Sequence, residues 1–366
     1  MSSKPIRVLV VDDSALMRKL IPQILETDDS IQVVGTAIDG NFGLKKIDDL
    51  KPQVVTLDLE MPGMGGLEML KEIMRRHRVP VIVVSSHSVE GASVTLKALS
   101  LGAFDFVSKP KDVSTRMQEI GRELIAKIKA AAQSRGIRIN TELDLPHPVP
   151  RAKTNLLAPK EPSKIVAIGI STGGPQSLQY MLAQFPADFP GSIVVVQHMP
   201  EGFTDMFARR LDECSSLSVK EAQSGDLLHA GRVLICPGNR HIKVKKLPLG
   251  DIVILSDDPP ANGHRPSADV MFKSVADEFG DKAIGVLMTG MGEDGANGLG
   301  LIKAAGGMTI AQGEQSCVVF GMPKAAIERG YAMRVVELDS LSATLQAHSR
   351  PGRTGQAGKA MSAGKD

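Results

Sequence analysis

The sequence predicts an α/β protein with two doubly wound, mainly parallel sheets, each in a domain of its own. Short apolar runs of strand length alternate with amphipathic stretches of helical spacing, first between residues 5 and 130 and again between residues 164 and 347. A Pro-rich stretch without apolar periodicity, residues 131–163, separates these regions and predicts a linker. The length of 366 residues agrees with two cores, because it exceeds the usual size of one.

In the first region, apolar runs typical of buried strands alternate with stretches typical of helices that have one apolar face. The strand-like runs are residues 7–11, 54–59, 79–86 and 104–108. The helical stretches are residues 14–27, 67–77 and 112–133, where apolar residues recur every three or four positions. This alternation implies a parallel sheet with helices on both faces.

The second region repeats the alternation. Its strand-like runs are residues 164–170, 192–198, 232–237, 252–256 and 283–290. The tail, residues 348–366, is rich in Gly, Ala and Lys and has little to bury, so we expect it to be disordered.

The composition argues against several classes of protein. The net charge of +2 and the lack of a basic stripe disfavour nucleic-acid binding. The apolar runs are too short for membrane insertion, and the N-terminal run turns acidic at once, unlike a signal peptide. The three cysteines lie far apart without metal or disulfide spacing, which suits a cytoplasmic protein.

Polar residues follow the strand-like runs of the first region. Asp12 and Asp13 follow one run, Asp58 ends another, and Ser85 and Lys109 follow two more. Because parallel strands end at one edge of a sheet, these side chains should converge. Three carboxylates together require a cation, and Mg²⁺ prefers such oxygen ligands. With the metal and Lys109 neutralising a phosphoryl group, Asp58 can act as the nucleophile, and Ser85 can then bind the phosphoryl oxygens.

Roughly the first 120 positions resemble the receiver domain of two-component response regulators. The resemblance rests on Asp12-Asp13, on Asp58 with the following "MPGMGG", on Ser85 and on Lys109-Pro110. It implies a flavodoxin-like fold, Phe106 as the switch aromatic, and phosphorylation of Asp58 by a histidine kinase. It also implies Mg²⁺ held by the three aspartates.

The stretch "IGISTGGP" places Ser171 after a strand, between two glycines, and allows three interpretations. Ser171 or Thr172 can cap the following helix. The glycines can cradle a phosphate, although the patterns of the common nucleotide loops are missing. Alternatively, Ser171 is a nucleophile on a strand–turn–helix junction, with open backbone amides beside it.

A serine nucleophile needs a base and an acid that orients the base. His198 follows the run 192–197, and Asp294 lies in a Gly-rich loop after the run 283–290, so both should reach the same sheet edge as Ser171. Glu293 beside it remains an alternative acid. His264, followed by Arg265, is a candidate to line a substrate cleft. Of the other histidines, His77, His87 and His147 are expected in the first region or the linker. His229 and His241 are expected in loops, and His348 in the tail.

Residues 164 to about 347 resemble the catalytic domain of the chemotaxis protein-glutamate methylesterases. The segments that carry the resemblance are "IGISTGGP", "VVQHMP", "NGHRPSADVMF" and "LMTGMGEDGANG". It implies a Rossmann-like sheet, Ser171 as nucleophile, His198 as base and Asp294 as orienting acid, with oxyanion contacts near Thr172 and Met291.

The implied substrates are methylated chemoreceptors, on which the family hydrolyses glutamate γ-methyl esters and deamidates glutamines without a cofactor. The resemblance also implies that the unphosphorylated receiver covers the active-site edge. The alternative is a receiver fused to a non-enzymatic binding module, which a fluorophosphonate probe on Ser171 would distinguish. A phosphatase or nucleotide-binding output would need an acidic cluster that the second region lacks.

Overall fold

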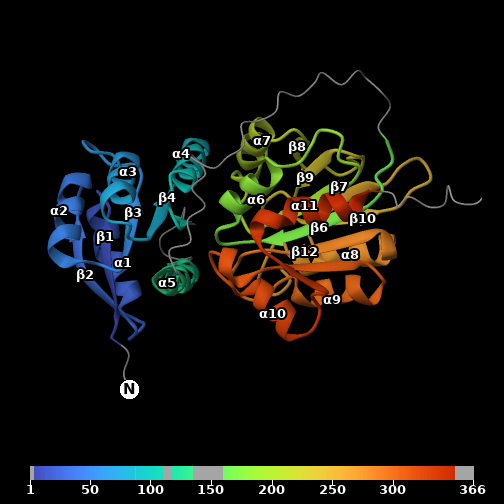
Figure 1. Ribbon diagram of the computed structural model, residues 1–366. Coiled ribbons are helices and arrows are strands. Elements are labelled where there is room, and N and C mark those ends of the chain that lie inside the picture. Colours follow the sequence, from blue (N-terminus) through green and yellow to red (C-terminus); the bar gives the residue numbers. More distant parts are fainter. Residues whose placement is uncertain (1–3, 87, 110–116, 135–159, 351–366) are drawn as a thin grey trace, which may run out of the picture.

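The computed structural model describes residues 4–86, 88–109, 117–134 and 160–350. They form two α/β domains that lie side by side (Figure 1). Pro110, residues 135–159 of the expected linker and residues 351–366 of the expected tail lie outside the described residues.

The first domain has a five-stranded sheet with the order β2-β1-β3-β4-β5, in which every neighbouring pair is parallel. This is the flavodoxin-like order that the sequence analysis implies. The strands are β1 (Ile6–Val11), β2 (Ile31–Ala37), β3 (Val54–Asp58), β4 (Val81–Ser85) and β5 (Asp105–Ser108). The helices are α1 (Ala15–Leu25), α2 (Gly40–Leu50), α3 (Gly66–Arg76), α4 (Val89–Ser100) and α5 (Met117–Gln133).

Alternate residues of the buried strands supply two cores, one on each face of this sheet. In β1, Leu9 and Val11 belong to the core that contains Ile47 of α2, whereas Val8 and Val10 belong to the core that contains Ile21 of α1. The strands therefore read as continuous apolar runs, as is typical of a parallel sheet covered on both faces.

The second domain has a seven-stranded sheet with the order β14-β13-β12-β6-β7-β9-β8, again parallel throughout. Its strands are β6 (Ile165–Ile170), β7 (Ser192–Gln197), β8 (Ser218–Glu221), β9 (Arg232–Ile235), β12 (Ala283–Leu287), β13 (Met308–Gln312) and β14 (Arg334–Val336). Its helices are α6 (Gly174–Leu182), α7 (Thr204–Cys214), α8 (Ala268–Phe279), α9 (Ala296–Ala304), α10 (Met322–Glu328) and α11 (Leu338–Ser349).

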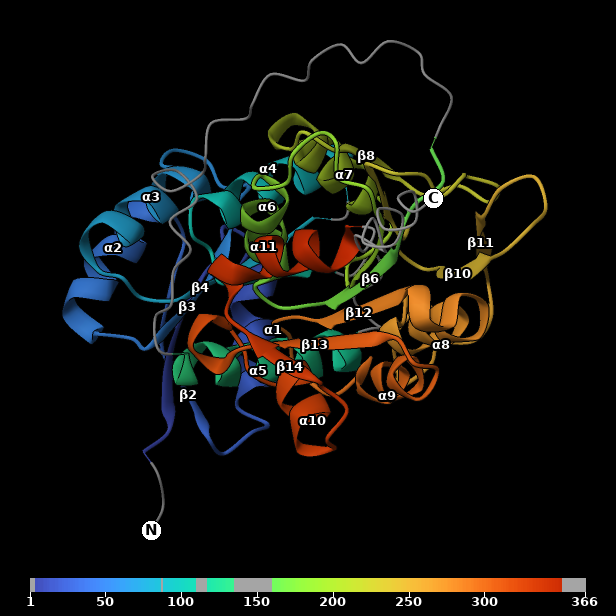
Figure 2. The same ribbon diagram turned by 45° about the vertical axis from the view of Figure 1, so that its right-hand side comes forward.

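The helices of the second domain cover both faces of its sheet (Figure 2). The core on one face includes residues of α6, α7 and α11, and the core on the other face includes residues of α8, α9 and α10. The chain runs from β6 to β7 on one side and later returns to β12 on the other side of β6. The carboxyl end of β6 is therefore a topological switch point, where open α/β sheets bind their ligands.

Three details differ from the sequence-based expectations. The run 252–256 is not in the main sheet: it forms β11 (Ile252–Ser256), which pairs antiparallel with β10 (His241–Lys245) in a separate hairpin. His241, expected in a loop, is the buried first residue of β10. Helix α11 extends to Ser349 because Leu345 and Ser349 are buried, so His348 belongs to this helix and not to the tail.

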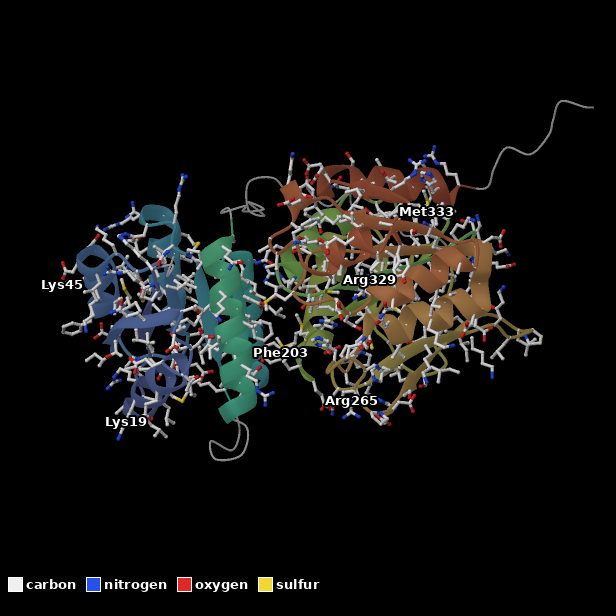
Figure 3. All side chains as sticks on the ribbon, turned by 90° about the horizontal axis from the view of Figure 1, so that it is seen from below. Lys19, Lys45, Phe203, Arg265, Arg329 and Met333 are labelled. Atoms are coloured by element: carbon white, nitrogen blue, oxygen red, sulfur yellow. The ribbon has the colours of Figure 1, made fainter. Side chains whose placement is uncertain are left out.

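The two domains share a continuous apolar cluster. Phe106 of β5 stacks on Phe203 of the second domain, with ring centroids 4.9 Å apart and an interplanar angle of 14°. Phe203 lies between the domains in Figure 3. The amide Nε2 of Gln176 in α6 donates to the carbonyl oxygens of Leu99 and Ala103, at 2.9 and 3.1 Å. The β5–α4–α5 side of the first domain thus rests on the second domain. Within the described parts of the chain, no helix is long and apolar enough to cross a membrane.

Candidate functional site

The first domain gathers its polar strand-end residues at one place. The carboxylates of Asp12, Asp13 and Asp58 have oxygen atoms within 4.8 Å of one another. Lys109 follows β5, and its Nζ lies 2.6 Å from Oδ2 of Asp58 and 3.2 Å from Oδ2 of Asp12. These four residues lie together because β1, β3 and β5 end at the same edge of the sheet.

Burial and ion pairing have opposite effects on the pKa values of Asp58 and Lys109. It raises the pKa of Asp58 above its ordinary value, although the ion pair with Lys109 opposes the shift. Burial alone would lower the pKa of Lys109, but Asp58 and Asp12 outweigh it and raise that pKa. The pKa of Asp58 therefore reflects both its burial and the positive charge of Lys109 beside it.

The donor set fits a divalent cation. Asp12 and Asp58 are buried, Asp13 is exposed, and Oδ2 of Asp12 accepts no hydrogen bond in the described parts of the chain. Oxygen ligands of this kind, with one side open to water, are those that Mg²⁺ prefers.

Ser85 and Phe106, the expected switch residues, both have partners outside the acidic cluster. The hydroxyl of Ser85 accepts a hydrogen bond from Oγ1 of Thr95 in α4 at 2.5 Å, so it contacts the helix that borders the second domain. Phe106 is 5% exposed because Phe203 covers it. Both expected switch residues therefore lie against parts of the chain that form the domain interface.

In the second domain, Ser171 follows β6 directly and lies at the start of a tight turn into α6. Gly173 adopts a φ of +75°, which a residue with a side chain rarely takes. A Cβ on Gly290 would lie 2.8 Å from Cβ of Ser171, so the loop after β12 approaches this serine too closely for any other residue. Gly173 thus permits the turn after Ser171, and Gly290 permits the close approach of the loop that follows β12.

His198 and Asp294 are joined by a hydrogen bond beside this turn. Ile170 pairs with Gln197, so Ser171 and His198 leave adjacent strands at matching positions. Nε2 of His198 lies 2.9 Å from Oδ2 of Asp294, and Nδ1 of His198 is buried without a hydrogen bond among the described residues. Asp294 is therefore the acid that reaches the imidazole. The alternative, Glu293, instead pairs with Arg329.

Asp294 is held at the N-terminus of α8. Its Oδ1 accepts from Oγ of Ser267 at 2.6 Å, and its Oδ2 accepts from the backbone N–H of Ala268 at 2.7 Å. Burial alone would raise the pKa of Asp294, but the bonds from His198, Ser267 and Ala268 outweigh it and hold that pKa well below its ordinary value. Asp294 is thus ionised at neutral pH and can only accept hydrogen bonds.

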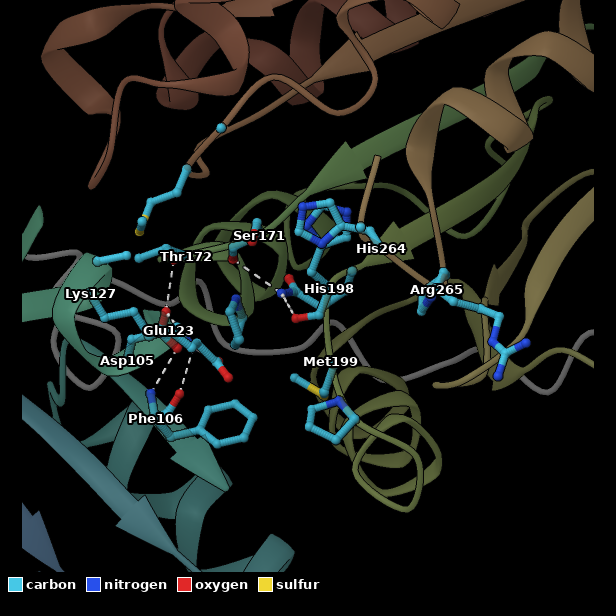
Figure 4. A pocket seen from close by; sticks show the side chains of 18 of the residues that line it. Asp105, Phe106, Glu123, Lys127, Ser171, Thr172, His198, Met199, His264 and Arg265 are labelled. Atoms are coloured by element: carbon cyan, nitrogen blue, oxygen red, sulfur yellow. Dashed lines mark hydrogen bonds and ion pairs between the residues drawn. The ribbon is translucent and has the colours of Figure 1, made fainter. Parts of the chain in front are cut away.

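The site opens into a cavity of about 650 Å³ that both domains line (Figure 4). Ser171, His198, Met291, His264 and Arg265 line it from the second domain. The backbone N–H groups of Thr172 and Met291 donate no backbone hydrogen bond to the described residues, as expected for groups that could meet an oxyanion. The guanidinium of Arg265 is held by Asn239 and points away from Ser171.

The individual residues by which the first domain lines this cavity were not predicted from the sequence, although the resemblance implied that this domain covers the active-site edge. Asp105, Glu123 and Lys127 line it. Oγ1 of Thr172 donates to Oδ2 of Asp105 at 2.8 Å, and Nζ of Lys127 lies 3.3 Å from the same carboxylate oxygen. Burial alone would lower the pKa of Lys127, but Asp105 and Glu123 raise it. Asp105 begins a strand and carries no sequence pattern that would indicate a contact with another domain.

Comparison with known proteins agrees with both sites. The family model described as CheB methylesterase matches residues 166–345, and the model described as response regulator receiver domain matches residues 8–120. The protein-glutamate methylesterase/protein-glutamine glutaminase 2 of Koribacter versatilis is 60% identical over 354 residues, which are 95% of this chain and 98% of that protein. The chain belongs to the CheB methylesterase family.

More distant members of the CheB methylesterase family agree in length and fold. The protein-glutamate methylesterase/protein-glutamine glutaminase of Pyrococcus horikoshii is 45% identical and spans 93% of each chain. The crystal structure of the Thermotoga maritima CheB methylesterase catalytic domain has a TM-score of 0.50 and 43% identity, and it covers 50% of this chain and 98% of that one. The two domains are hereafter called the receiver domain and the methylesterase domain.

We expect Ser267→Ala to lower the free energy of unfolding by about 1–3 kcal/mol, because a buried carboxylate would lose its hydrogen bond from the hydroxyl. The measurement is the urea transition of the methylesterase domain in the full chain at pH 7. Ser340→Ala is the matched control, since Ser340 is exposed on α11 and its loss should change the free energy by no more than about 0.5 kcal/mol. Equal effects of the two substitutions would contradict the role given to Ser267.

Proposed function

We propose that the protein is a phosphorylation-regulated serine hydrolase of the chemotaxis type. It removes the γ-methyl ester of glutamate on chemoreceptors, releases methanol, and deamidates receptor glutamines. The observation that carries this proposal is the buried hydrogen bond between His198 and Asp294, at a strand end in register with Ser171. Since the expected substrate is the cytoplasmic part of a receptor, we expect the protein to act in the cytoplasm.

The hydrogen-bonding partners determine the direction of proton transfer. Because ionised Asp294 can only accept, Nε2 of His198 carries the hydrogen, and the unpartnered Nδ1 has the lone pair. Nδ1 takes the proton of Ser171 as Oγ attacks the ester carbonyl. The imidazolium then gives this proton to the departing methoxide, which leaves as methanol.

The second half of the reaction repeats these roles. Water attacks the glutamyl ester of Ser171, gives a proton to Nδ1 of His198, and releases glutamate as the proton returns to Oγ. Backbone N–H groups at Thr172 and Met291 would stabilise the oxyanion, an effect typically worth about 3 kcal/mol per donor. A glutamine side chain offers the same carbonyl, with ammonia as the leaving group.

We expect Ser171→Ala and His198→Ala each to abolish methanol release from methylated receptor membranes while the fold is kept. Asp294→Ala should retain more activity, because an unoriented imidazole still acts as a base part of the time. Glu293→Ala is the matched control and should turn over at a near-normal rate, since Glu293 pairs with Arg329 at the surface. Near-normal turnover in Ser171→Ala would exclude the serine mechanism.

In the receiver domain, Asp58 is the proposed acceptor of a phosphoryl group from a chemotaxis-type histidine kinase. Asp12, Asp13 and Asp58 would hold Mg²⁺, which would neutralise charge on the transferring group. Lys109 already pairs with Asp58 and is positioned to bind the phosphoryl oxygens.

Asp58→Asn should therefore prevent labelling by a small phosphodonor such as acetyl phosphate, and chelation of Mg²⁺ should do the same in the native chain. The measurement is radiolabel bound per chain after reaction with donor. Asp49→Asn, an exposed change on α2, should be labelled like the native protein. Labelling that survives in Asp58→Asn, or that survives chelation, would refute this acceptor site.

The domain interface supports regulation by docking. Receiver residues wall the cavity that contains Ser171, and the carboxylate of Asp105 holds the hydroxyl of Thr172, next to the proposed nucleophile. A carboxylate at this place restricts entry and opposes negative charge on a reacting carbonyl. Ser85 and Phe106 link this interface to Asp58 through α4 and β5. Phosphorylation would thus favour the undocked state.

The energy required for such a switch is modest. A shift from mostly docked to mostly undocked needs about 2–5 kcal/mol of differential stabilisation. A phosphoryl group on Asp58 would draw the hydroxyl of Ser85 away from Thr95. Such a change shifts the equilibrium only if it alters the free energies of the docked and undocked states by different amounts.

Asp105→Ala should raise methanol release by the unphosphorylated full chain about tenfold, because it removes a charge-assisted hydrogen bond worth about 1.5–3 kcal/mol from the docked state only. The rate should then respond less to phosphodonor. Asp49→Ala, on the exposed side of α2, is the control and should leave both rates unchanged. An unstimulated rate in Asp105→Ala equal to the native one would rule out this contact as inhibitory.

A further inference from the structure

His264 lies against the imidazole of the proposed base. The rings of His198 and His264 are stacked, with centroids 4.0 Å apart and an interplanar angle of 6° (Figure 4). The edge of His198 is occupied by Asp294 at Nε2, and its Nδ1 is left for Ser171. His264 therefore contacts His198 through the ring face, the direction that neither Asp294 nor Ser171 controls.

The backbone holds His264 in this position. Asn262 and Gly263 have φ values of +52° and +77°, and the backbones of Ala261 and His264 exchange two hydrogen bonds across them, at 3.0 and 2.9 Å. This is the tight two-residue turn that Asn-Gly favours. The side chain of Asn262 also donates to Oδ1 of Asp294 at 3.3 Å. One turn thus connects the stacked ring to the carboxylate that binds His198.

His264 is neutral at physiological pH. Burial lowers its pKa to about 4, and the charge of His198 adds to this effect, while Asp294 and Glu123 oppose it. A neutral ring presents an electron-rich face to its neighbour. Such a face attracts a cation, and here it lies directly over His198, which becomes a cation when it takes the serine proton.

We propose that His264 is a positioning residue that holds the ring plane of His198 and stabilises the imidazolium form through face-to-face stacking. This inference rests on the proposed function, because it assigns His198 as the base. It does not require His264 to exchange a proton or to bind the substrate. What matters is the flat aromatic face, so another aromatic ring should serve.

An alternative role for His264 is to donate to the substrate. If His264 donated a hydrogen bond or a proton to the substrate, its nitrogen atoms would matter and a phenyl ring would fail. The two roles are thus separated by comparing His264→Phe, which keeps an aromatic face, with His264→Leu, which keeps apolar volume without one.

The test measures kcat and KM for methanol release by the full-length, phosphodonor-treated protein on methylated receptor membranes. His264→Leu should lower kcat about 3- to 30-fold with KM within twofold of native, as expected for a lost cation–π contact. His264→Phe should restore most of kcat. Its kcat/KM profile should keep the native shape between pH 5 and 9, since native His264 is already neutral there.

Controls make each outcome decisive. His229→Ala removes a histidine outside the cavity and should leave kcat unchanged. An unchanged kcat in His264→Leu, or a phenyl variant as slow as the leucine variant, would overturn the stacking role. An acid limb that becomes less steep in His264→Phe would also overturn it, because the native limb would then include the titration of His264. If His198→Ala itself kept full activity, the proposed function would fail instead.

Discussion

The pairing of β6 with a parallel strand on each side is the constraint on which the methylesterase site depends. β7 and β12 flank β6, and all three strands end at the same edge of the sheet. Ser171 and His198 follow strands in register, and the loop after β12 returns Asp294 to the same place. A buried carboxylate is stable only when hydrogen bonds satisfy its oxygen atoms. Here Ser267 and Ala268 supply those bonds to Asp294.

The same edge also serves as the docking surface for the receiver domain. The interface combines an apolar contact, Phe106 on Phe203, with a polar one in which Lys127, Asp105 and Thr172 are joined. The polar groups must lose water to dock, which offsets much of their attraction. Under the proposed function, this interface forms before phosphorylation of Asp58 and is released after it.

The strand-end argument predicted much of both sites from the sequence, because parallel strands expose their carboxyl ends together. It brought Asp12, Asp58 and Lys109 to one cluster, and Ser171 and His198 to another. This rule could not decide between Asp294 and Glu293. Both residues lie in one loop at the same edge of the sheet, but their side chains point in different directions.

Features that arise from packing between distant segments were not predictable in this way. The contact of Asp105 with Thr172 depends on how two domains meet, and neither residue stands out in its own segment. The stack of His264 on His198 depends on a turn whose place over the sheet is a tertiary property. The hairpin of β10 and β11 was misassigned to the main sheet because its apolar run resembles that of a buried parallel strand.

The apolar cluster that crosses the interface links the two domains thermodynamically. Residues such as Phe106, Leu96, Phe203 and Phe207 belong to one buried core, although they come from two separate domains. While the domains are docked, unfolding one of them exposes part of the other's core to water, so the heat-capacity changes of the two are not independent. The docked chain therefore unfolds with greater cooperativity than the undocked chain. The shape of the calorimetric unfolding transition thus differs between the docked and the undocked chain.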